Sequence, residues 1–514
     1  MSSTMTSEEV FKEIIAHCKE YGFIFPSSEI YDGLGAVYDY GPYGCELKKN
    51  IQDFWWRSMV QLNENIVGID AAIFMHPKTW KASGHIDAFN DPLIDNKDSK
   101  KRYRADVLIE QAIEKLQAKI EREAEKAQKK FGEAFDREKF LATNPNVQRL
   151  SRKIAETQSR LKKALDENDL SALRQIIVDL DIACEVSGSK NWTEVRQFNL
   201  MFATQLGSLA EEASTIYLRP ETAQGIFVNF LNVLNTARQK IPFGIAQVGK
   251  AFRNEIVARQ FIFRTREFEQ MEMQFFVRPG EEMKWYEYWK QERMRWHRAL
   301  GLPAAKLRFL DHLKTAHYAN AAVDIQYEFP FGFRELEGIH SRTDFDLKNH
   351  QELSGKKMQY FDPELNQSYI PYVVETSAGL NRTLFAVIAN GYTHEQLPDG
   401  SSRVVLRIAP FLAPVKVAIF PLVKKDGLPE KARAIMDQLK YEFQCFYEEK
   451  DTIGRRYRRQ DAIGTPYCIT IDHQTLQDNT VTIRERDTMQ QERVDISRIA
   501  DIVRARVDWV KALR

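Results

Sequence analysis

The sequence of 514 residues lacks the marks of disulfide-rich, secreted and membrane-spanning proteins. Its five cysteines are scattered without a CxxC pair, which argues against a disulfide framework and against a zinc site built from thiolates. No run of about 18 uncharged apolar residues occurs, so we expect no transmembrane span and no membrane partner. The N-terminus has no basic segment followed by an apolar core, so we expect no secretory signal and a reducing, cytoplasmic location.

The chain also lacks an excess of either charge. Lysine and arginine total 73 and aspartate and glutamate total 72, which excludes a globally basic protein that coats nucleic acid. A local basic patch remains possible at residues 455–460, RRYRRQ, where four arginines surround Tyr457. Such a run is either a solvated surface or a contact for RNA through phosphate pairing and base stacking.

Internal repeats and low-complexity tracts are absent, so changes in composition mark the domains. Residues 105–190 are rich in strong helix formers and predict two or three exposed helices, inserted between residues 1–104 and 191–410. These helices either pack on one another with solvated outer faces or form an arm that faces nucleic acid. Residues 411–514 alternate strand and helix patterns, which is typical of a compact α/β module of about 100 residues.

Several familiar site motifs are incomplete. Residues 244–251 approach the pattern GxxxxGK[ST] but end in alanine, so the hydroxyl that would hold magnesium is missing and a strand is predicted instead. Residues 33–35 lack the third glycine of a dinucleotide-binding motif. His312 and His317 occur without an HExxH motif, so a metalloprotease site has no support.

The most informative segment, residues 241–280, predicts two long strands joined by a loop near 255–264. Because side chains alternate along a strand, each strand has one polar face and one apolar face. The polar face comprises Ile245, Gln247, Gly249, Ala251 and Arg253 from the first strand and Arg266, Phe268, Gln270, Glu272 and Gln274 from the second. This face suits a ligand platform, although an amphipathic hairpin with one face in water would show the same alternation.

The same segment resembles a known motif. FRNE at 252–255, followed by RTREFEQMEMQFF, is similar to motif 2 of class II aminoacyl-tRNA synthetases, and ETSAGLNR at 375–382 is similar to motif 3. Further matches, in the expected order, are SSEIYDGLGAVYDYGPYGCELK (27–48), SGH (83–85), KRYRAD (101–106), LRPETAQGIFVNF (218–230), ELEGIHSRTDFDL (335–347) and APVKVAIFPLV (413–423). The chain therefore resembles the homodimeric type of glycyl-tRNA synthetase, a class IIa family.

This resemblance implies an α+β fold: a class II synthetase antiparallel sheet flanked by helices, a helical insertion and a C-terminal α/β anticodon-binding domain. It implies that glycine attacks the α-phosphorus of ATP to form glycyl-adenylate, and that glycine then passes to the 3′ end of tRNA(Gly). ATP, glycine and tRNA(Gly) would be the partners, with Mg²⁺ as the cofactor of ATP. A single Cys184 stands where related enzymes carry cysteine pairs, so no zinc is expected.

The resemblance also implies site residues, with Arg253 and Arg382 as the catalytic pair. Planar guanidinium groups suit this role because they donate paired hydrogen bonds to phosphate and carboxylate and do not deprotonate. The carboxylate expected to hold magnesium is Glu335, with Glu337 as the alternative. The ATP-binding set is Arg253, Asn254, Glu255, Phe263, Arg264, Thr265, Arg266, Glu267, Phe268, Glu335, Leu336, Gly379, Leu380, Asn381 and Arg382.

For glycine the resemblance implies a pocket that excludes side chains. Glu221 and Glu272 would hold the ammonium group, and Ser377 would crowd the Cα hydrogens, because an overpacked site rejects an added methyl group. The glycine-binding set is Arg104, Glu221, Phe268, Glu269, Gln270, Met271, Glu272, Glu375, Thr376, Ser377, Ala378 and Gly379.

Residues 42–74 resemble motif 1, which would build a homodimer interface with Trp55 and Trp56 as candidate contributors. One rival interpretation is a class IIa ligase for serine, threonine or proline, which amino-acid-dependent pyrophosphate exchange separates. Another is a non-catalytic paralogue that binds nucleic acid. Such proteins usually lose the phosphate-binding arginines, and this chain has both Arg253 and Arg382.

Overall fold

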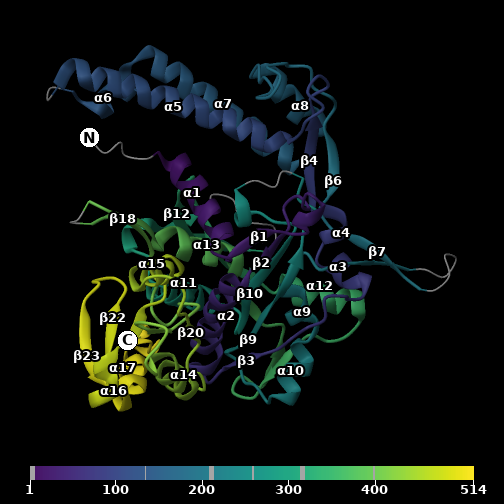
Figure 1. Cartoon of the computed structure of the whole chain (residues 1–514). Coiled ribbons are helices and arrows are strands. Elements are labelled where there is room, and N and C mark those ends of the chain that lie inside the picture. The colour runs from purple at the N-terminus through teal and green to yellow at the C-terminus, as the bar shows by residue number, and fades with distance from the viewer. Residues whose placement is uncertain (1–5, 133–134, 208–213, 257–259, 313–318, 398–399) are drawn as a thin grey trace. The chain divides into compact units, whose positions relative to one another are not determined.

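The computed structural model describes residues 6–132, 135–207, 214–256, 260–312, 319–397 and 400–514 (Figure 1). These residues form two compact units. The first consists of Met1–Ser83, Ala203–Arg253 and Arg259–Arg514, and the second of Gly84–Phe202 and Asn254–Ala258. Among the described helices, none combines the length and the apolar composition that crossing a membrane requires.

The centre of the first unit is a seven-stranded sheet with the strand order β11-β12-β13-β16-β10-β9-β3. Each neighbouring pair is antiparallel except β3 with β9, which confirms the prediction of a mainly antiparallel sheet. Its strands are β3 (Ile66–Gly68), β9 (Phe243–Phe252), β10 (Glu267–Val277), β11 (Leu307–Asp311), β12 (Ala321–Phe329), β13 (Gly332–Thr343) and β16 (Tyr372–Gly379).

The strands β9 and β10 form the predicted hairpin. Residues 257–259 of its loop lie outside the described part of the chain. Gln247 stands opposite Glu272 in the register, so the two polar faces predicted from the alternation join into one. On the other side, Met271 and Met273 are fully buried in the main core. Burying each such side chain stabilises the fold by about 1.5–3 kcal/mol.

The apolar side of the sheet packs on helices. Gly44 lets the first of these approach the preceding chain, because a Cβ there would lie 1.8 Å from the carbonyl oxygen of Phe23. Trp55 is fully buried in the core on the inner face of the same helix, so it is unsuited to the subunit interface for which it was a candidate, whereas Trp56 is only partly buried. The helices are α2 (Pro42–Trp56, continued by a π-helical turn at Arg57–Gln61), α11 (Glu282–Ala299) and α13 (Leu380–Gly391).

Shorter elements complete the first unit outside its C-terminal part. The N-terminal helix begins at Thr6, which forms a reciprocal capping box with Glu9. The elements are α1 (Ser7–Glu20), β1 (Ile24–Pro26), β2 (Tyr38–Tyr40), α3 (Pro77–Ala82), β7 (Ala203–Leu206), β8 (Ser214–Tyr217), α9 (Ala223–Val228), α10 (Phe230–Thr236), α12 (Phe345–Ser354), β14 (Tyr360–Asp362), β15 (Gln367–Tyr369), β17 (Tyr392–Gln396) and β18 (Ser402–Leu406).

Residues 411–514 form the predicted module of strands and helices around a core of their own. Its five-stranded sheet has the order β20-β19-β21-β22-β23, in which β20 and β21 run parallel to β19. The elements are β19 (Val417–Pro421), α14 (Leu428–Leu439), β20 (Cys445–Tyr447), α15 (Ile453–Ile463), β21 (Tyr467–Ile471), α16 (His473–Asp478), β22 (Thr480–Glu485), β23 (Gln491–Asp495), α17 (Ile499–Arg506) and α18 (Val510–Leu513).

The basic run at 455–460 lies within α15 and is only partly a surface. Arg456 is 2% exposed and donates hydrogen bonds to backbone carbonyl oxygens, so it holds the module together. The hydroxyl group of Tyr457 shares a hydrogen bond with that of Thr470. Because a helix turns every 3.6 residues, one side of the run is inside, and Arg455 is its clearly exposed arginine.

The second unit combines a three-stranded sheet, ordered β5-β4-β6, with long helices. The helices α5 and α7 lie side by side (Figure 1), and Ile109, Ile154 and Leu161 are buried in their common core. The helices predicted for residues 105–190 thus pack on one another. The second unit extends beyond residues 105–190 because it also contains the strands on either side of these helices. The elements are α4 (His85–Ala88), β4 (Asn90–Asp95), β5 (Arg102–Arg104), α5 (Ala105–Phe131), α6 (Arg137–Thr143), α7 (Pro145–Asp166), α8 (Leu170–Asp179) and β6 (Arg196–Asn199).

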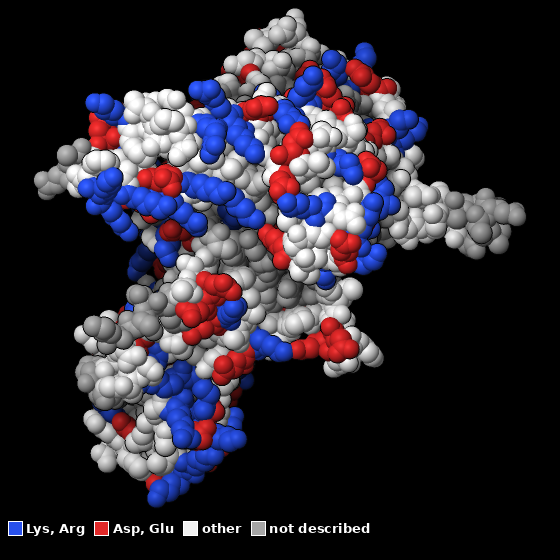
Figure 2. Space-filling view, turned by 90° about the horizontal axis from the view of Figure 1, so that it is seen from above, with Lys and Arg blue, Asp and Glu red and all other residues white. Residues whose placement is uncertain are grey.

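The surface charge follows the composition. Figure 2 shows basic and acidic side chains interspersed over the face that it presents. A binding surface for RNA on this face would therefore depend on particular arginines rather than on a broad field of one sign.

Candidate active site

The polar face of the sheet is built around two buried carboxylates, Glu272 of β10 and Glu375 of β16. The side-chain amide of Gln274 joins them, because its Nε2 donates to Glu272 Oε1 at 2.8 Å and to Glu375 Oε1 at 2.8 Å. The register explains this contact, since Gln274 stands opposite Glu375. The two carboxylates thus share one hydrogen-bond network in the middle of the sheet.

The surroundings shift the pKa values of the two carboxyl groups in opposite directions. Burial raises the pKa of Glu272 well above its ordinary value, and the charges of Glu375 and Glu221 raise it further. Burial also opposes ionisation of Glu375, but Arg342 and His340 outweigh it and lower the pKa of that carboxyl group. Arg342 Nη1 donates to Glu375 Oε1 at 3.1 Å. A cation placed beside Glu272 would supply the compensation that this carboxylate lacks.

Polar side chains from neighbouring segments surround Glu272. Ser377 stands directly opposite it in the register, and its Oγ accepts a hydrogen bond of 3.3 Å from Gln270 Nε2. Gln270 Oε1 accepts from the backbone N–H of Thr222 at 3.1 Å, and the hydroxyl group of Thr222 donates to Glu272. Each of these groups is held in place before any ligand is present.

Arg253 and Phe268 lie at the end of the hairpin next to this network. Arg253 Nε donates to the carbonyl oxygen of Pro220 at 3.0 Å, and its guanidinium carbon lies 5.2 Å from the centre of the Phe268 ring. The backbone N–H of Arg253 donates to the carbonyl oxygen of Arg266. The catalytic arginine predicted on β9 is therefore anchored at its backbone and at Nε.

Arg382 reaches the same region from α13. Its Nη1 lies 3.0 Å from Glu335 Oε2, and its Nε donates to the carbonyl oxygen of Phe263 at 3.1 Å. Although burial opposes it, the charge of Arg382 lowers the pKa of Glu335, and the charges of His340 and Arg253 add to the effect. Arg382 therefore pairs with Glu335, and the charge of Arg253, from a segment far away in the chain, also acts on that carboxylate.

A β-bulge separates the two glutamates considered for metal binding. The register between β12 and β13 shifts at Ile325 and Gln326, so that Leu336 is the extra residue between Glu335 and Glu337. Glu337 is fully buried on the other side of the sheet, at 2.6 Å from Arg293 Nε and 2.8 Å from His297 Nε2. Glu335 has a side chain that is 46% exposed. Of the two, Glu335 is the carboxylate that can reach a bound ion.

Several other predicted residues do not point their side chains to the polar face. Strand alternation or the bulge places four of them inside, and the other two enter the core from a turn and from the start of α13. Only their backbone groups or ring edges can therefore line a ligand site. Those with buried side chains in the main core are Phe263, Met271, Leu336, Ala378 and Leu380, and Thr376 is buried on the same side of β16.

The remaining predicted residues of the first unit rim the polar face. Asn381 Oδ1 accepts from the backbone N–H of Glu269 at 2.9 Å, which ties α13 to β10. Lys48 Nζ lies 2.6 Å from Glu269 Oε1. The others are Arg264, Thr265, Arg266, Glu267 and Gly379; Arg266 donates to Gly35, Thr265 to the carbonyl oxygen of Glu267, and Glu267 pairs with Lys250.

Arg104, Asn254 and Glu255 belong to the second unit. Arg104 lies between Asp106 at 2.6 Å and Asp91 at 3.1 Å. Burial opposes the charge of Arg104, but Asp106, Asp91 and Glu255 together raise its pKa. Within this unit, Arg104 and Glu255 therefore belong to one charged cluster.

Sequence reasoning missed four residues of the network: Thr222, Gln274, His340 and Arg342. Gln274 was placed on the polar face without a role. His340 and Arg342 alternate along β13 within the segment ELEGIHSRTDFDL, and this alternation was the available signal. What the pattern lacked was the register, which sets His340 opposite Glu375.

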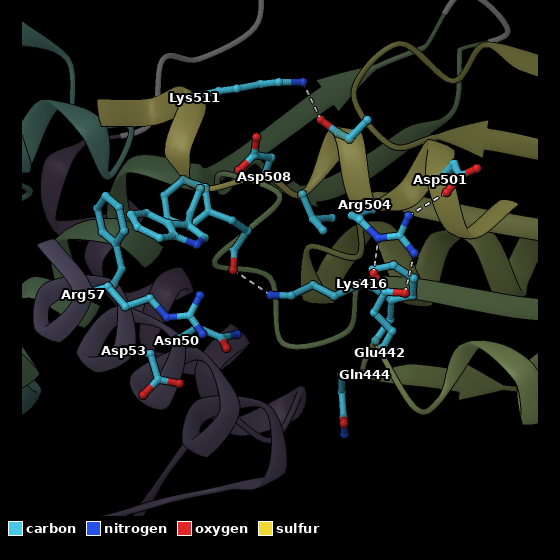
Figure 3. Close-up of a pocket in the computed structure, with 16 residues that line it drawn as sticks. Asn50, Asp53, Arg57, Lys416, Glu442, Gln444, Asp501, Arg504, Asp508 and Lys511 are labelled. Atoms are coloured by element: carbon cyan, nitrogen blue, oxygen red, sulfur yellow. Dashed lines mark hydrogen bonds and ion pairs between the residues drawn. The ribbon is translucent and has the colours of Figure 1, made fainter. Parts of the chain in front are cut away.

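A pocket lies elsewhere in the first unit (Figure 3). This pocket of about 840 Å³ is lined by residues that include Asp53, Arg57, Lys416, Arg504 and Trp509, and by none of the predicted site residues. Burial lowers the pKa of Lys416 to about 7, while its Nζ donates to two backbone carbonyl oxygens. Its cations are thus occupied by the protein itself, and the pocket lacks the buried carboxylates of the polar face.

Comparison with known protein families covers three parts of the chain. Residues 202–391 match the tRNA synthetase class II core domain (G, H, P, S and T). Residues 91–200 match the glycyl-tRNA synthetase insertion domain 1, and residues 416–506 match the anticodon binding domain.

Full-length relatives agree with these matches. The glycine--tRNA ligase of Chlorobaculum tepidum is 51% identical over 96% of this chain and 98% of its own length. That of Geobacillus thermodenitrificans is 48% identical over 95% of this chain and 96% of its own length, and that of Borreliella burgdorferi is 47% identical over 96% and 97%.

Proposed function

This chain belongs to the glycine–tRNA ligase family, and from that premise we propose how its residues divide the work of the enzyme. The reaction activates glycine with ATP to glycyl-adenylate and transfers glycine to tRNA(Gly). In the first step two anions approach each other and negative charge gathers at phosphorus. Preorganised cations therefore matter more than an acid–base pair.

Arg253 and Arg382 are the cations of this step. Arg253 binds the α-phosphate and the incoming carboxylate, and Arg382 binds the γ-phosphate side. The observation that supports this assignment most is that Arg382 pairs with Glu335 at 3.0 Å and that the charge of Arg253 also lowers the pKa of the same carboxylate. Phe268, within 5.2 Å of the Arg253 guanidinium, stacks on adenine. The rest of the predicted ATP-binding set is assigned to the nucleotide by the resemblance alone.

Glycine binds beside Glu272. Its ammonium group pairs with Glu272 and Glu221 and supplies the positive charge that the raised pKa of Glu272 calls for. Ser377, opposite Glu272, crowds the Cα of glycine so that a methyl group clashes. Overpacking of this kind costs about 1–3 kcal/mol. Because each competing amino acid is larger, no editing step is needed. Arg104 and the rest of the glycine-binding set are assigned to glycine by the resemblance alone.

A divalent metal accompanies ATP in class II synthetases, and we assign Mg²⁺ to this role. Glu335 fits as its protein ligand, since it is a half-exposed carboxylate beside the guanidinium group of Arg382, which is assigned to phosphate binding. Hard oxygen ligands of this kind, together with phosphate oxygens, suit Mg²⁺. When bound, the ion offsets charge on the triphosphate. The chemistry requires no zinc.

The remaining assignments concern the whole enzyme. We assign residues 1–104 and 191–410 to catalysis, 105–190 to the insertion and 411–514 to binding of the tRNA(Gly) anticodon. The enzyme acts in the cytoplasm as a homodimer, with the motif 1 region at residues 42–74 in the interface. Trp56, rather than the buried Trp55, contributes to it.

Pyrophosphate exchange tests the proposal. The purified full-length chain is given ATP, Mg²⁺, labelled pyrophosphate and each of the twenty amino acids in turn. Exchange with glycine alone, retained when tRNA is omitted, is the expected result. Exchange driven by serine, threonine or proline would assign the chain another substrate, and no exchange with any amino acid would remove the proposed activation step.

A further inference from the structure

Three side chains on the outer part of the sheet converge, and none of them has a role in the reaction proposed above. His312 follows β11, Asp324 lies on β12 and His340 lies on β13. His312 Nε2 is 2.9 Å from Asp324 Oδ1. One atom from each residue, imidazole nitrogen or carboxylate oxygen, lies within 4.8 Å of the other two. His317, the other histidine considered in the sequence, lies outside the described residues.

The strand register causes this convergence. Asp324 stands opposite Gly338, and Ala322 stands opposite His340. The backbone N–H of His312 donates to the carbonyl oxygen of Ala322 at 3.0 Å, which fixes the start of its side chain next to β12. The side chains of His312, Asp324 and His340 therefore leave the sheet on the same polar face.

Gly338 makes room for the ring of His340. A Cβ on Gly338 would lie 3.0 Å from His340 Cε1 and 3.4 Å from Nε2. The ring thus lies over the glycine, on the side from which Asp324 projects on the adjacent strand. A larger residue at position 338 would push the imidazole away from the cluster.

A carboxylate orients the same ring from behind. His340 Nδ1 lies 2.5 Å from Glu375 Oε2, and Glu375 is itself held by Arg342 and Gln274. With Nδ1 donating to this carboxylate, a zinc ion would take the place of the proton on Nε2, and the ring would bind the ion through that nitrogen. This carboxylate–histidine arrangement is the usual outer support of a histidine that binds a metal ion.

We propose that His312, Asp324 and His340 form a binding site for Zn²⁺. Two imidazoles and one carboxylate are the borderline ligand set that zinc accepts, whereas Mg²⁺ and Ca²⁺ favour oxygen ligands alone. Ligand atoms around tetrahedral zinc lie about 3.3 Å apart for bonds of about 2.0–2.1 Å. The cluster, at 2.9–4.8 Å, needs only small side-chain rotations to reach this geometry. Three protein ligands leave the fourth position for water or a ligand.

The proposed site adjoins Glu335, whose charge acts on Asp324 and on His340, but it uses none of the residues assigned to magnesium and does not depend on the proposed reaction. The expectation of no zinc was based on the cysteines and concerned thiolate ligands, whereas these ligands come from strands that only the fold brings together. Zinc here would be an additional bound ion and not a reactant. Its presence is therefore measured by binding, apart from any aminoacylation activity.

Metal binding by the full-length protein tests the proposal. The protein is freed of metal with EDTA, and Zn²⁺ is titrated in competition with a chromophoric chelator, with elemental analysis after gel filtration. One zinc per chain is expected. The variants His312→Ala, Asp324→Ala and His340→Ala should each weaken binding at least 10–100-fold, and Glu375→Gln, which removes the outer support, about 10-fold.

Two variants serve as controls. His473→Ala removes a histidine that also pairs with a carboxylate, Asp426, at 3.0 Å, and it should leave zinc binding unchanged. Glu335→Gln should still bind one zinc per chain, with only the small loss of affinity that removing a nearby negative charge causes, since Glu335 is not one of the three ligands. Loss of zinc in either control, with the three ligand variants unaffected, would place the ion elsewhere and overturn the proposal.

Co²⁺ in the wild-type protein gives a test that needs no variant. Cobalt bound by this set in four- or five-fold coordination should produce intense visible absorption, and Zn²⁺ should displace it. Weak absorption typical of octahedral cobalt, or less than one zinc per chain at micromolar zinc, would overturn the proposal even if a ligand variant fails to fold.

Discussion

At the residue scale, the opposed environments of Glu272 and Glu375 explain how two buried carboxylates can coexist in one network. Glu375 has Arg342 and His340 as counter-charges, whereas Glu272 receives only neutral hydrogen bonds from Thr222 and Gln274. Among the described residues, no cation forms a hydrogen bond with Glu272, so its negative charge is poorly compensated. The ammonium group of glycine fits this deficit, and the deficit leaves a measurable trace in the pH dependence of stability.

Glu272→Gln should stabilise the protein relative to the wild type at high pH and less so at low pH. The pKa of Glu272 is raised in the folded state, so the folded protein binds this proton more tightly than the unfolded chain. Wild-type stability therefore falls as the pH rises from the unfolded pKa to the folded pKa, and the glutamine variant lacks this loss. Melting temperatures from about pH 5 to about pH 8 measure the difference.

The control is Glu375→Gln, for which the sign reverses. The pKa of Glu375 is lowered in the folded state, so its stabilising effect is present above the unfolded pKa and disappears as the pH falls through the folded pKa. This variant should melt lower than the wild type at neutral pH. If both variants shift the melting temperature in the same direction at each pH, the two carboxyl groups do not have opposite pKa shifts.

Ser377→Ala should loosen the rejection of alanine. Removing the hydroxyl group opens space opposite Glu272, where the methyl group of alanine would otherwise clash. A site that discriminates by one methyl group provides about 1–3 kcal/mol, so the ratio of glycine to alanine in kcat/KM should fall about 10-fold. Pyrophosphate exchange with each amino acid measures it, and an unchanged ratio would mean that Ser377 does not crowd the substrate.

At the element scale, the period-two pattern of residues 241–280 predicted the hairpin and its polar face, because alternation is a local property of an extended chain. Which of the two carboxylates, Glu335 or Glu337, is available to a metal ion could not be predicted. Ideal alternation puts both on one face, and the bulge at Leu336 separates them. That bulge depends on the register between β13 and the preceding strand β12, which the alternation within β13 alone does not encode.

The basic run of α15 shows the same limit. Composition indicated a charged surface, and it did not distinguish the inner from the outer side of the helix. Arg456 and Tyr457 make their contacts with β19 and β21 or with the chain beside them. Those contacts depend on tertiary packing, and packing decides which arginines of the run remain outside.

Gly44→Ala should destabilise the packing of α2 against the chain before it. The added Cβ would lie 1.8 Å from a backbone oxygen of Phe23, which cannot rotate away as a side chain could. Overpacking at such a site costs about 1–3 kcal/mol or more. Chemical denaturation measures the decrease in the free energy of unfolding.

Gly454→Ala is the matched control in α15, because nothing lies within 4 Å of a Cβ at this position. Replacing a helical glycine there should stabilise the protein by about 0.5–1 kcal/mol. Equal effects of the two substitutions would show that the backbone of Phe23 is not in close contact with α2.

At the scale of the whole molecule, adenylate formation is assigned to the catalytic domain and anticodon recognition to the C-terminal module. Arg455→Glu combined with Arg458→Glu should weaken tRNA(Gly) binding and leave exchange without tRNA nearly intact. The slope of log affinity against log salt should become shallower by about 2, because each of the two arginines would no longer neutralise a phosphate. Arg498→Glu with Lys440→Glu, an equal change in charge elsewhere in the module, is the control. Equal decreases in exchange and in tRNA binding would contradict the separation.

The domain composition was also predictable in outline, since helix-forming residues and strand alternation differ between 105–190 and its neighbours. The extent of the second unit was not, because β4, β5 and β6 are short strands whose pairing joins distant segments. The candidate site was predictable only in part. Its arginines could be recognised from sequence motifs, whereas the network that supports them could be recognised only from the strand register.

The central claim is that Arg253 and Arg382 act together on one triphosphate. Its most direct measurement is glycine-dependent pyrophosphate exchange by Arg253→Ala and Arg382→Ala, with Arg493→Ala, an arginine paired with Asp472 in the C-terminal module, as the control. Each catalytic variant should lose about 10²–10³-fold in kcat while it unfolds at the wild-type temperature, and the control should keep its rate. Exchange within a few-fold of the wild type in either catalytic variant would contradict the account.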